Sequence, residues 1–513
     1  MAPDMNRRQF LGTTAASAAA FSIVPRHVLG GPNYVAPSEK INLAYIGCGT
    51  QGFREMVGLL QSSDVQIVSV CDPNKDSMDY VDWSTQEIPR LIRRTMGKPA
   101  WREGMKGIPG GREVAREMVD AYYANNLASE KYKGCSAYAD FRELLEKEKD
   151  LDAVKIMTPD HLHATIAVAA MKKGKHVAVH KPLANRLAEA RLVIETARKT
   201  KVATHFLPAN DGAMIRVLAD WIKEGAIGTL REIHNWTNRP VWPQYTTLPT
   251  DTPPVPDGLD WDLWLGPVPD RPYHPHFTHA VFRGWYDFGG GSMADMGHYS
   301  LWSVFNIFNL DSPISVESTP SHACAIVDQV SRPINNNFSF PDACAIRFKF
   351  AAKGDGPAME LFWYDGGMRP RVPEELEEDN GSFGLEGMML VGDKGKILAG
   401  YYGNNPRIIP ERKMHEFSSA HNLAAPVPPE PPARNQSGTS ERDRAWVEAF
   451  KSGKSTYGDF LLGGAISDAA NLGAISLRLG GRKLLFDSEN MKITNVPEAN
   501  AYLTREYRKG WEL

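Results

Sequence analysis

The chain has 513 residues, 42% hydrophobic and 23% charged, which is long enough for two or more domains with large cores. Its formal net charge of -3 gives no basic field for nucleic acid or anionic lipid, which favours a small-molecule partner. The five cysteines form no CxxC pair, and so sparse and odd a set argues against a disulfide framework and a zinc site.

The first 35 residues have the features of an export signal. Arg7 and Arg8 precede Phe10 and an alanine-rich apolar stretch at 11–24, which is too short to span a membrane comfortably. The arginine pair is similar to a twin-arginine signal, which exports folded proteins, often with their cofactor bound. We therefore leave residues 1–35 out of the fold and expect an exported, periplasmic protein. An amphipathic or disordered start is the alternative, because no clear cleavage site precedes Gly31.

A glycine-rich turn predicts a nucleotide site. The apolar run at 41–46 has the character of a buried strand, the turn at 47–52 has G-x-G-x-x-G spacing, and a helix-like stretch follows at 53–60. The glycines permit a tight turn, a close approach to a pyrophosphate and close packing of helix on strand, and amides at the helix N-terminus hold the phosphates. A plain glycine-rich turn is the alternative. The expected cofactor-binding residues here are Gly47, Gly49, Thr50, Gln51 and Gly52.

An acidic residue follows the second strand. The apolar run at 65–70 ends in Cys71 and Asp72, and Asp72 lies twenty positions after Gly52. A carboxylate at this place accepts from the ribose 2′-hydroxyl and repels a 2′-phosphate, so we expect NAD rather than NADP. Because Pro73 follows, a simple turn or helix cap is the alternative.

The second half of this domain leads to a lysine. Residues 73–138 are charged and helix-prone, with a glycine- and proline-rich motif at 107–111 that predicts no function, and we interpret them as an insertion. Strands are predicted at 151–157 and 175–179, and the second ends in His180 and Lys181. Ligands bind beyond the carboxyl ends of parallel strands, so Lys181 is expected beside the cofactor.

From this point the sequence resembles the Gfo/Idh/MocA family of sugar and cyclitol dehydrogenases. Family members carry Glu-Lys-Pro or a similar tripeptide where this chain has His-Lys-Pro at 180–182, so His180 departs from the commonest glutamate. The Thr-Pro-Asp-His-Leu-His segment at 158–163 is similar to the family's cofactor-proximal turn. Further similar segments lie at 260–267, 289–298, 363–367 and 507–511. The resemblance implies cofactor contacts at Thr158, Pro159, His161, His163, His180 and Lys181.

The catalytic residues are expected after the glycine-rich turn at 289–292. Asp295 precedes His298 by three positions and Tyr299 by four, so either pair can share one helix face. Oxidising an alcohol requires a base with a pKa near the working pH, which histidine has unshifted and lysine attains only by burial or a nearby positive charge. A solvated lysine, a capping aspartate and a core histidine are the structural alternatives.

The resemblance assigns roles to these residues. It implies that Lys181 lies at the junction of nicotinamide and substrate, where it orients and polarises the hydroxyl. Asp295 then binds a substrate hydroxyl or orients its partner, and either His298 or Tyr299 relays the proton. The family's pattern is an acid followed four positions later by histidine or tyrosine, which Tyr299 fits and His298 misses by one place.

The rest of the chain predicts a second domain. Strand-like runs joined by turns favour an α/β Rossmann dinucleotide-binding domain plus an α+β domain with a large, mostly antiparallel, open-faced sheet. Family members use such a sheet for oligomer contacts, so the resemblance implies a homo-oligomer, either a dimer or a tetramer. The expected domains are 36–182 for the Rossmann fold, 183–440 for the second domain with a surface excursion at 404–439, and 441–513 for C-terminal helices and a tail that pack on both.

Aromatic residues are dense between 236 and 286. Their rings can stack on the C–H faces of a sugar, although most are expected in the core. Trp285 is the candidate for substrate contact, together with Lys181, Asp295 and His298. Three histidines in this region have the spacing of metal ligands, but no carboxylate or cysteine pattern accompanies them, so no metal is expected. They are His274, His276 and His279.

These features favour an NAD(P)-dependent oxidoreductase that acts on a ring hydroxyl of a sugar, glycoside or cyclitol. An exported enzyme has no obvious free NAD pool, so we expect the nucleotide to stay tightly bound. The family includes glucose-fructose oxidoreductases and also NAD-dependent glycosidases of family 109, so a glycosidase or lyase that works by transient ring oxidation is one alternative. A non-catalytic sugar-binding protein is another. In each case the partner is a small carbohydrate, with no nucleic acid and no stable membrane span.

Overall fold

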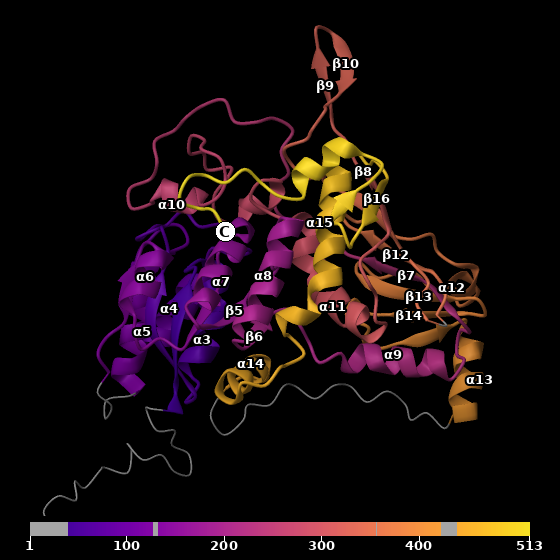
Figure 1. Ribbon diagram of the computed structural model, residues 1–513, viewed down its shortest axis with the longest axis horizontal. Helices are drawn as coiled ribbons and strands as arrows, with labels where there is room; N and C mark the ends of the chain where they lie inside the picture. Colours follow the sequence, from indigo (N-terminus) through magenta and orange to yellow (C-terminus); the bar gives the residue numbers. More distant parts are fainter. Residues whose placement is uncertain (1–38, 127–131, 355, 422–438) are drawn as a thin grey trace, which may run out of the picture.

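The computed structural model describes residues 39–126, 132–354, 356–421 and 439–513 (Figure 1). The predicted export segment, residues 1–35, lies outside the described residues. Within the described ranges, none of the helices has the length and apolar character needed to cross a membrane.

The N-terminal domain is built on a six-stranded parallel sheet. Its strand order is β3-β2-β1-β4-β5-β6, with the crossover between β1 and β4 that marks a dinucleotide-binding fold. Apart from the edge strand β3, whose residues are half-buried, the strands are short runs buried on both faces, as expected where helices cover both sides. Their bounds are β1 (Ile41–Ile46), β2 (Val65–Cys71), β3 (Ser136–Tyr138), β4 (Ala153–Ile156), β5 (His176–Val179) and β6 (Thr204–Phe206).

Two groups of helices cover the two faces of this sheet and pack in two different hydrophobic cores, the second of which continues into the second domain. One core takes its helical residues from α3 (Thr50–Leu60), α4 (Glu87–Met96), α5 (Arg112–Asn126) and α14 (Glu441–Ser452). The other takes them from α6 (Phe141–Lys147), α7 (His163–Lys172) and α8 (Leu187–Thr200). Because α14 comes from the C-terminal segment, the end of the chain completes the first domain.

A nine-stranded sheet forms the second domain (Figure 1). Its order is β15-β14-β13-β7-β12-β11-β8-β16-β17, and every neighbouring pair is antiparallel except β7 with β12. The strands are β7 (Leu230–Trp236), β8 (Ser315–Pro320), β11 (Cys344–Phe350), β12 (Met359–Tyr364), β13 (Gly387–Gly392), β14 (Lys396–Ala399), β15 (Arg407–Ile409), β16 (Leu484–Asp487) and β17 (Lys492–Ile493). The predicted fold class is therefore confirmed.

Alternation along the central strands gives this sheet two different faces. Ile346, Phe348 and Leu361 are buried, and they pack in one core with residues of α11 (His298–Ile307) and α15 (Gly464–Arg478). Arg347 and Phe362, which point the other way, are only partly covered. The second face is thus left open, as the sequence predicted.

Some boundaries differ from those expected. The parallel sheet continues past residue 182, because α8 and β6 add another crossover, and it ends at Phe206. The segment 441–513 contributes β16 and β17 as well as helices. The surface excursion expected at 404–439 contains β15 and α13 (Glu411–His421), so its described part is largely regular structure.

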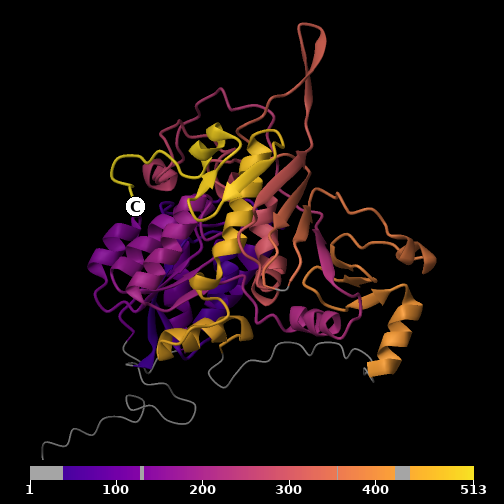
Figure 2. The same ribbon diagram turned by 45° about the vertical axis from the view of Figure 1, so that its right-hand side comes forward.

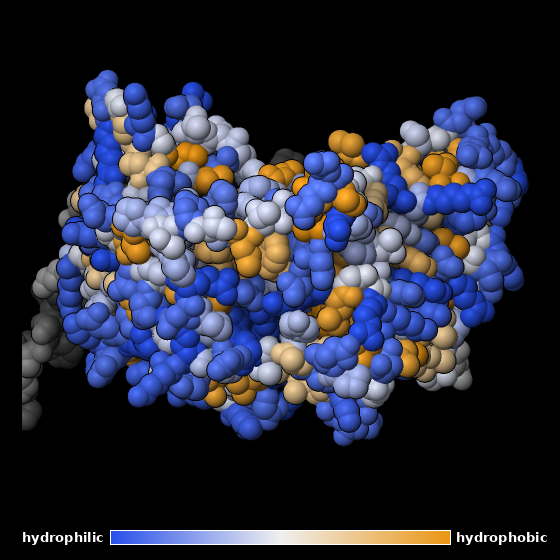
Figure 3. Space-filling model, turned by 90° about the horizontal axis from the view of Figure 1, so that it is seen from above, coloured by the Kyte–Doolittle hydropathy of each residue, from blue (hydrophilic) through white to orange (hydrophobic). Residues whose placement is uncertain are grey.

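The remaining elements lie at the edges of the molecule. A hairpin of β9 (Cys324–Val327) and β10 (Val330–Pro333) projects from the end of the large sheet (Figure 2). Seen from above, the surface is mostly hydrophilic, with hydrophobic residues in separate groups (Figure 3). The other short elements are α9 (Ala213–Lys223), α10 (Trp261–Leu265) and α12 (Glu374–Glu378).

Candidate active site

A turn at the carboxyl end of β1 has the backbone that a dinucleotide requires. Gly47 has φ +100°, and a Cβ on it would lie 2.5 Å from the carbonyl carbon of Met157. A Cβ on Gly52 would lie 2.5 Å from the carbonyl oxygen of Gly47. Only glycine fits at these two places, and the turn leads directly into the N-terminus of α3. The residues present therefore fit a pyrophosphate held by backbone amides.

Asp72 follows β2 and is tied to the same turn. Its carboxylate accepts from the Cys48 amide at 2.7 Å and from the Asn74 amide at 2.8 Å. Burial raises its pKa, and these two backbone hydrogen bonds oppose the rise. The side chain still lines the cavity, so it is placed both to brace the turn and to meet a ribose hydroxyl.

One cavity, with an open volume of about 1580 Å³, joins the glycine turn to the second domain. Most of the predicted site residues line it, including residues from both domains. They are Gly47, Gly49, Thr50, Gln51, Gly52, Asp72, Thr158, Pro159, His180, Lys181, Asp295 and Tyr299.

Four of the predicted residues lie behind the cavity wall. Trp285 is 1% exposed, donates its indole N–H to the His276 carbonyl at 2.7 Å and stacks on Tyr245. His161 donates to the Trp264 carbonyl at 2.8 Å. The His163 ring lies between the carbonyls of Thr158 and Pro182, at 2.9 and 2.6 Å, and so links the ends of β4 and β5. The fourth is His298.

His298 packs in the core. Its Nδ1 donates to the Ala294 carbonyl at 2.7 Å, its ring meets Phe206 edge-on, and burial lowers its pKa to about 4. The cause is the π-helical turn η4 (Met293–Gly297) that carries Asp295. A π-turn holds more residues per turn than an α-helix, so the residue four positions on, rather than three, returns to the face of Asp295. That residue is Tyr299.

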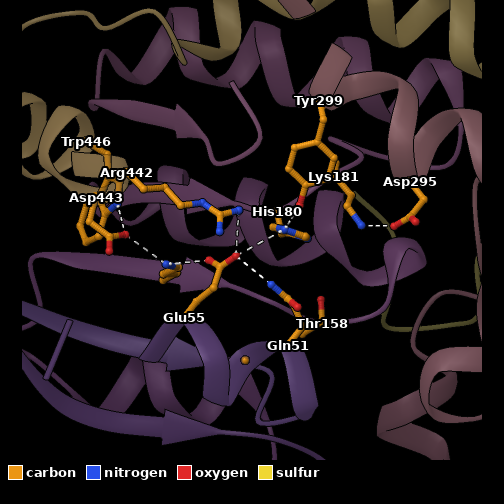
Figure 4. Close-up of polar contacts among 12 residues, drawn as sticks. Gln51, Glu55, Thr158, His180, Lys181, Asp295, Tyr299, Arg442, Asp443 and Trp446 are labelled. Atoms are coloured by element: carbon orange, nitrogen blue, oxygen red, sulfur yellow. Dashed lines mark hydrogen bonds and ion pairs between the residues drawn. The ribbon is translucent and has the colours of Figure 1, made fainter. Parts of the chain in front are cut away.

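Lys181 and Asp295 form a buried ion pair at the junction of the two domains (Figure 4). The Nε of Arg283 lies 3.3 Å from Oδ1 of Asp295. Burial alone would raise the pKa of Asp295, but Lys181 and Arg283 lower it to about 2. Burial and the nearby charge of Arg283 lower the pKa of Lys181, whereas the charge of Asp295 raises it. The ammonium group of Lys181 therefore releases its proton more readily than that of an ordinary lysine.

Backbone contacts hold the two halves of this junction together. Asp160, in the turn after β4, accepts from the Gly290 amide at 3.0 Å. One residue later, the His161 amide donates to the Phe288 carbonyl at 3.1 Å. The segment that precedes Asp295 is therefore fixed against the end of the parallel sheet, which explains how side chains far apart in sequence meet.

Tyr299 reaches the cavity from α11. Its hydroxyl lies 3.0 Å from Nε2 of His180, and the Nζ of Lys181 lies 5.6 Å from the centre of its ring (Figure 4). Burial raises its pKa, so the phenol is protonated at neutral pH. The phenol of Tyr299, which carries its proton, and the ammonium group of Lys181 thus both line the cavity.

Sequence reasoning missed several residues that line the cavity. Tyr80 and Trp83 come from the segment interpreted as an insertion, and a Cβ on Gly110 would lie 2.2 Å from the Tyr80 ring. The glycine- and proline-rich motif at 107–111 therefore has a packing function, which is to let the 77–82 stretch approach the cavity. Other lining residues that were not assigned to the site from the sequence include Arg239, Trp242, His279 and Arg283. Their only sequence signal was the general density of aromatic and basic residues between 236 and 286.

The described residues, with gaps at 127–131, 355 and 422–438, contain no group of three His, Cys, Asp or Glu side chains placed to hold a metal ion. The groups at the junction are the ammonium of Lys181, the carboxylate of Asp295, the phenol of Tyr299 and the imidazole of His180, and all four line the cavity.

Curated relatives match part of the chain. One is an alpha-N-acetylgalactosaminidase from Shewanella oneidensis, 25% identical over 220 residues, which are 42% of this chain and 39% of that protein. Another is glycosyl hydrolase family 109 protein 1 from Shewanella sp. (strain ANA-3), 25% identical over 222 residues, 43% of this chain and 39% of that protein. The chain thus spans about two fifths of the length of these relatives.

Solved structures match over a larger share of the chain. A WlbA dehydrogenase from Chromobacterium violaceum, in complex with NADH and UDP-GlcNAcA, is 14% identical, with a TM-score of 0.49 over 88% of this chain and 97% of that one. An NAD binding oxidoreductase from Klebsiella pneumoniae is 14% identical, with a TM-score of 0.48 over 88% of this chain and 100% of that one.

Two family models match consecutive parts of the chain. Residues 99–206 match the NAD-binding Rossmann fold of the oxidoreductase family Gfo/Idh/MocA. Residues 220–360 match the C-terminal alpha/beta domain of the same family. The first match begins after β1, the glycine turn and β2, and it ends with β6, the last strand of the parallel sheet. Residues 99–206 and 220–360 are therefore similar to the NAD-binding Rossmann domain and the C-terminal α/β domain of the Gfo/Idh/MocA oxidoreductase family.

Proposed function

We propose that the protein oxidises or reduces a ring hydroxyl of a sugar, glycoside or cyclitol with tightly bound NAD. One observation carries this proposal. The Lys181–Asp295 pair and the Tyr299 hydroxyl lie on the wall of the same cavity as the glycine turn and Asp72. A nucleotide on the turn and a substrate on the pair would share this cavity, which is the arrangement that hydride transfer requires.

The glycine turn and Asp72 would hold the nucleotide, which, when bound, supplies a hydride acceptor. Lys181 donates a hydrogen bond to the substrate hydroxyl and stabilises the negative charge that develops on its oxygen. Asp295 fixes the amine and is itself held ionised by Lys181 and Arg283. The Tyr299 oxygen accepts the proton that leaves the substrate hydroxyl. Trp242 and Trp83 line the cavity, where their rings can stack on the C–H faces of a sugar.

A second candidate is a glycosidase or lyase that oxidises a ring carbon transiently. The two curated relatives described above favour it, because they are named as a glycosyl hydrolase family 109 protein and an alpha-N-acetylgalactosaminidase. The same residues serve both candidates, since both begin with removal of a hydride and a hydroxyl proton. They differ in whether the nucleotide is reduced at the end of a turnover.

Nucleotide analysis combined with a glycoside screen tests both candidates. Mass spectrometry of the small molecules released from purified, denatured protein should identify NAD. Accumulation of a keto-sugar together with NADH supports the net oxidoreductase. Release of an aglycone or a free sugar without NADH accumulation supports the glycosidase. A protein that binds a sugar but turns over none, with its Lys181→Ala variant binding equally well, is the non-catalytic sugar-binding protein.

Two further proposals concern the setting of this activity. We propose that the twin-arginine segment directs export to the periplasm, with the nucleotide bound before export. We also propose that the open face of the nine-stranded sheet, which carries Arg347 and Phe362, supports a homo-oligomer. Cell fractionation with and without Arg7→Lys/Arg8→Lys tests the first, and light scattering of purified protein tests the second.

A further inference from the structure

A buried cluster of charges lies next to the active site but outside the residues discussed so far (Figure 4). The carboxylate of Glu55, on α3, lies 2.9 Å from the Nζ of Lys155 and 3.2 Å from a guanidinium nitrogen of Arg442. Lys155 also lies 3.4 Å from Asp443. The side chains of Glu55, Lys155 and Asp443 are 5%, 1% and 7% exposed. Three separate parts of the chain, α3, β4 and α14, thus bury their charges at one point.

This charge cluster reaches the cavity through His180. Oε1 of Glu55 lies 3.6 Å from Nε2 of His180, and the same nitrogen lies 3.0 Å from the Tyr299 hydroxyl. At 3.6 Å the carboxylate acts on the imidazole through its charge rather than through a hydrogen bond, so Nε2 remains available to the phenol. The order Glu55, His180, Tyr299 therefore leads from the buried charges to the wall of the cavity.

The charge of Glu55 is fixed by its neighbours. Burial alone would raise the pKa of Glu55, but Lys155, Arg442 and His180 lower it well below its ordinary value. Burial and Lys181 lower the pKa of His180, while Glu55 opposes them. The imidazole is thus neutral when the site is at rest, and the carboxylate beside it favours any positive charge that the ring acquires.

Burying charges is costly, and a simple apolar contact between α3, β4 and α14 would hold these elements equally well. The cluster also contacts the nucleotide turn, because the side-chain amide of Gln51 donates a hydrogen bond to Oε1 of Glu55 at 3.2 Å. A purely structural ion pair needs neither this contact nor an imidazole directed at Tyr299. The position of the cluster points instead to a role in moving the proton.

We propose that His180 accepts the proton of Tyr299 during turnover, and that Glu55 is a positioning residue whose charge offsets the imidazolium that forms. This proposal rests on the proposed function. The O–H bond of the substrate breaks and its proton bonds to the Tyr299 oxygen, while the O–H bond of Tyr299 breaks and its proton bonds to Nε2 of His180. The electron pair of the substrate C–H bond leaves with the hydride that the proposed function assigns to NAD. His180, which lines the cavity, then returns its proton to water there.

The test uses the full-length, NAD-loaded protein and four variants: Glu55→Gln, His180→Gln, Tyr299→Phe and Glu189→Gln. Glu189 is the matched control, because its side chain is 2% exposed and pairs with Arg505 at 2.6 Å, away from the cavity. We expect His180→Gln to lower kcat about 100-fold and Glu55→Gln to lower it about 10-fold, both with little change in KM, because each removes help to the proton transfer and no substrate contact. Glu189→Gln should leave kcat as in the wild type.

Two further measurements distinguish a role of His180 in proton transfer from a role that only stabilises the fold. The ¹⁵N resonances of His180, assigned by their loss in His180→Gln, should show an unprotonated Nε2 in the resting protein and should move in Tyr299→Phe. The solvent isotope effect on kcat should indicate more than one proton in transfer for the wild type and a single proton for His180→Gln.

The outcomes distinguish this proposal from the proposed function. If the wild type turns over no sugar, glycoside or cyclitol, the proposed function fails and the relay fails with it. If the wild type is active but His180→Gln retains its kcat, or Nε2 is protonated at rest, the relay alone is overturned. An equal loss of kcat in Glu55→Gln and Glu189→Gln assigns the cluster to the fold and removes Glu55 from the proposal.

Discussion

The two walls of the cavity differ in how the chain builds them. The nucleotide wall, residues 47–72, is one continuous stretch in which the backbone conformation forms the binding site. The hydroxyl wall consists of Lys181, Asp295 and Tyr299, side chains that come from the end of β5, the η4 turn and α11. Substitutions in the two walls should therefore have different effects. Changes in the nucleotide wall should affect binding and stability, and changes in the hydroxyl wall should affect rate.

The largest effect is expected at Lys181. Lys181→Ala should lower kcat about 1000-fold, because the amine that polarises the hydroxyl and balances Asp295 is lost. The NAD content of the purified protein should stay near that of the wild type, since the glycine turn is intact. Steady-state kinetics with nucleotide quantification checks both. Lys172→Ala, at an exposed position near the end of α7, is the control. Loss of nucleotide together with activity would contradict the separation of the two walls.

Gly47→Ala should have the opposite pattern. A Cβ there meets the Met157 carbonyl group at 2.5 Å and the backbone stays at φ +100°, so the free energy of unfolding should fall by about 3 kcal/mol and bound NAD should be lost. Denaturant unfolding and nucleotide analysis measure the two effects. Gly174→Ala is matched, because Gly174 has φ +73° but open space around it, and it should cost about 1 kcal/mol. Equal losses in the two variants would show that the turn is not closely packed.

Tyr299→Phe and His298→Gln sharpen the description of the hydroxyl wall. We expect Tyr299→Phe to lower kcat about 100-fold, because it removes the hydroxyl that lies 3.0 Å from Nε2 of His180. His298→Gln should lower thermal stability but change kcat much less, since the ring packs in the core. Measuring kcat and the unfolding temperature of both variants distinguishes them. The reverse pattern would assign the proton relay to His298.

The smallest effect is expected at Asp72. Asp72→Asn keeps an oxygen for one of the two backbone amides but removes the charge, so NAD affinity should fall about 10-fold and the preference over NADP should shrink. Titration of both nucleotides into stripped protein measures this. Asp76→Asn, on the same loop but paired with Arg102, should leave both affinities as they are. If the ratio of NAD affinity to NADP affinity is unchanged in Asp72→Asn, the role of Asp72 is only to stabilise the turn.

The nucleotide wall was predictable because its signal is local. Gly47 has a positive φ and Gly52 packs against the carbonyl of Gly47, so both constraints can be recognised from a spacing of six residues, and Asp72 follows the next strand. Lys181 was predictable for a similar reason, since the carboxyl end of a parallel strand faces the ligand. The choice between His298 and Tyr299 stayed open, because spacing on an ideal helix allows both, and only the π-helical turn selects one.

The burial of Trp285, His161 and His163 could not be read from the sequence either. An aromatic or imidazole ring that lines a cavity and one that packs behind its wall have the same local pattern. Their difference depends on partners such as the carbonyls of His276 and Trp264, which are near only in the folded chain.

The sequence by itself determined the class of fold, the glycine turn and the two residues, Asp72 and Lys181, that end strands of the parallel sheet. These depend on period, spacing and backbone freedom, which act over a few neighbouring residues. Only the tertiary structure decided that Arg283, His180, Glu55 and Arg442 meet around Tyr299 and Asp295. Those contacts join segments up to 387 positions apart, as measured from Glu55 to Arg442, and the packing of distant segments rather than local preference brings them together.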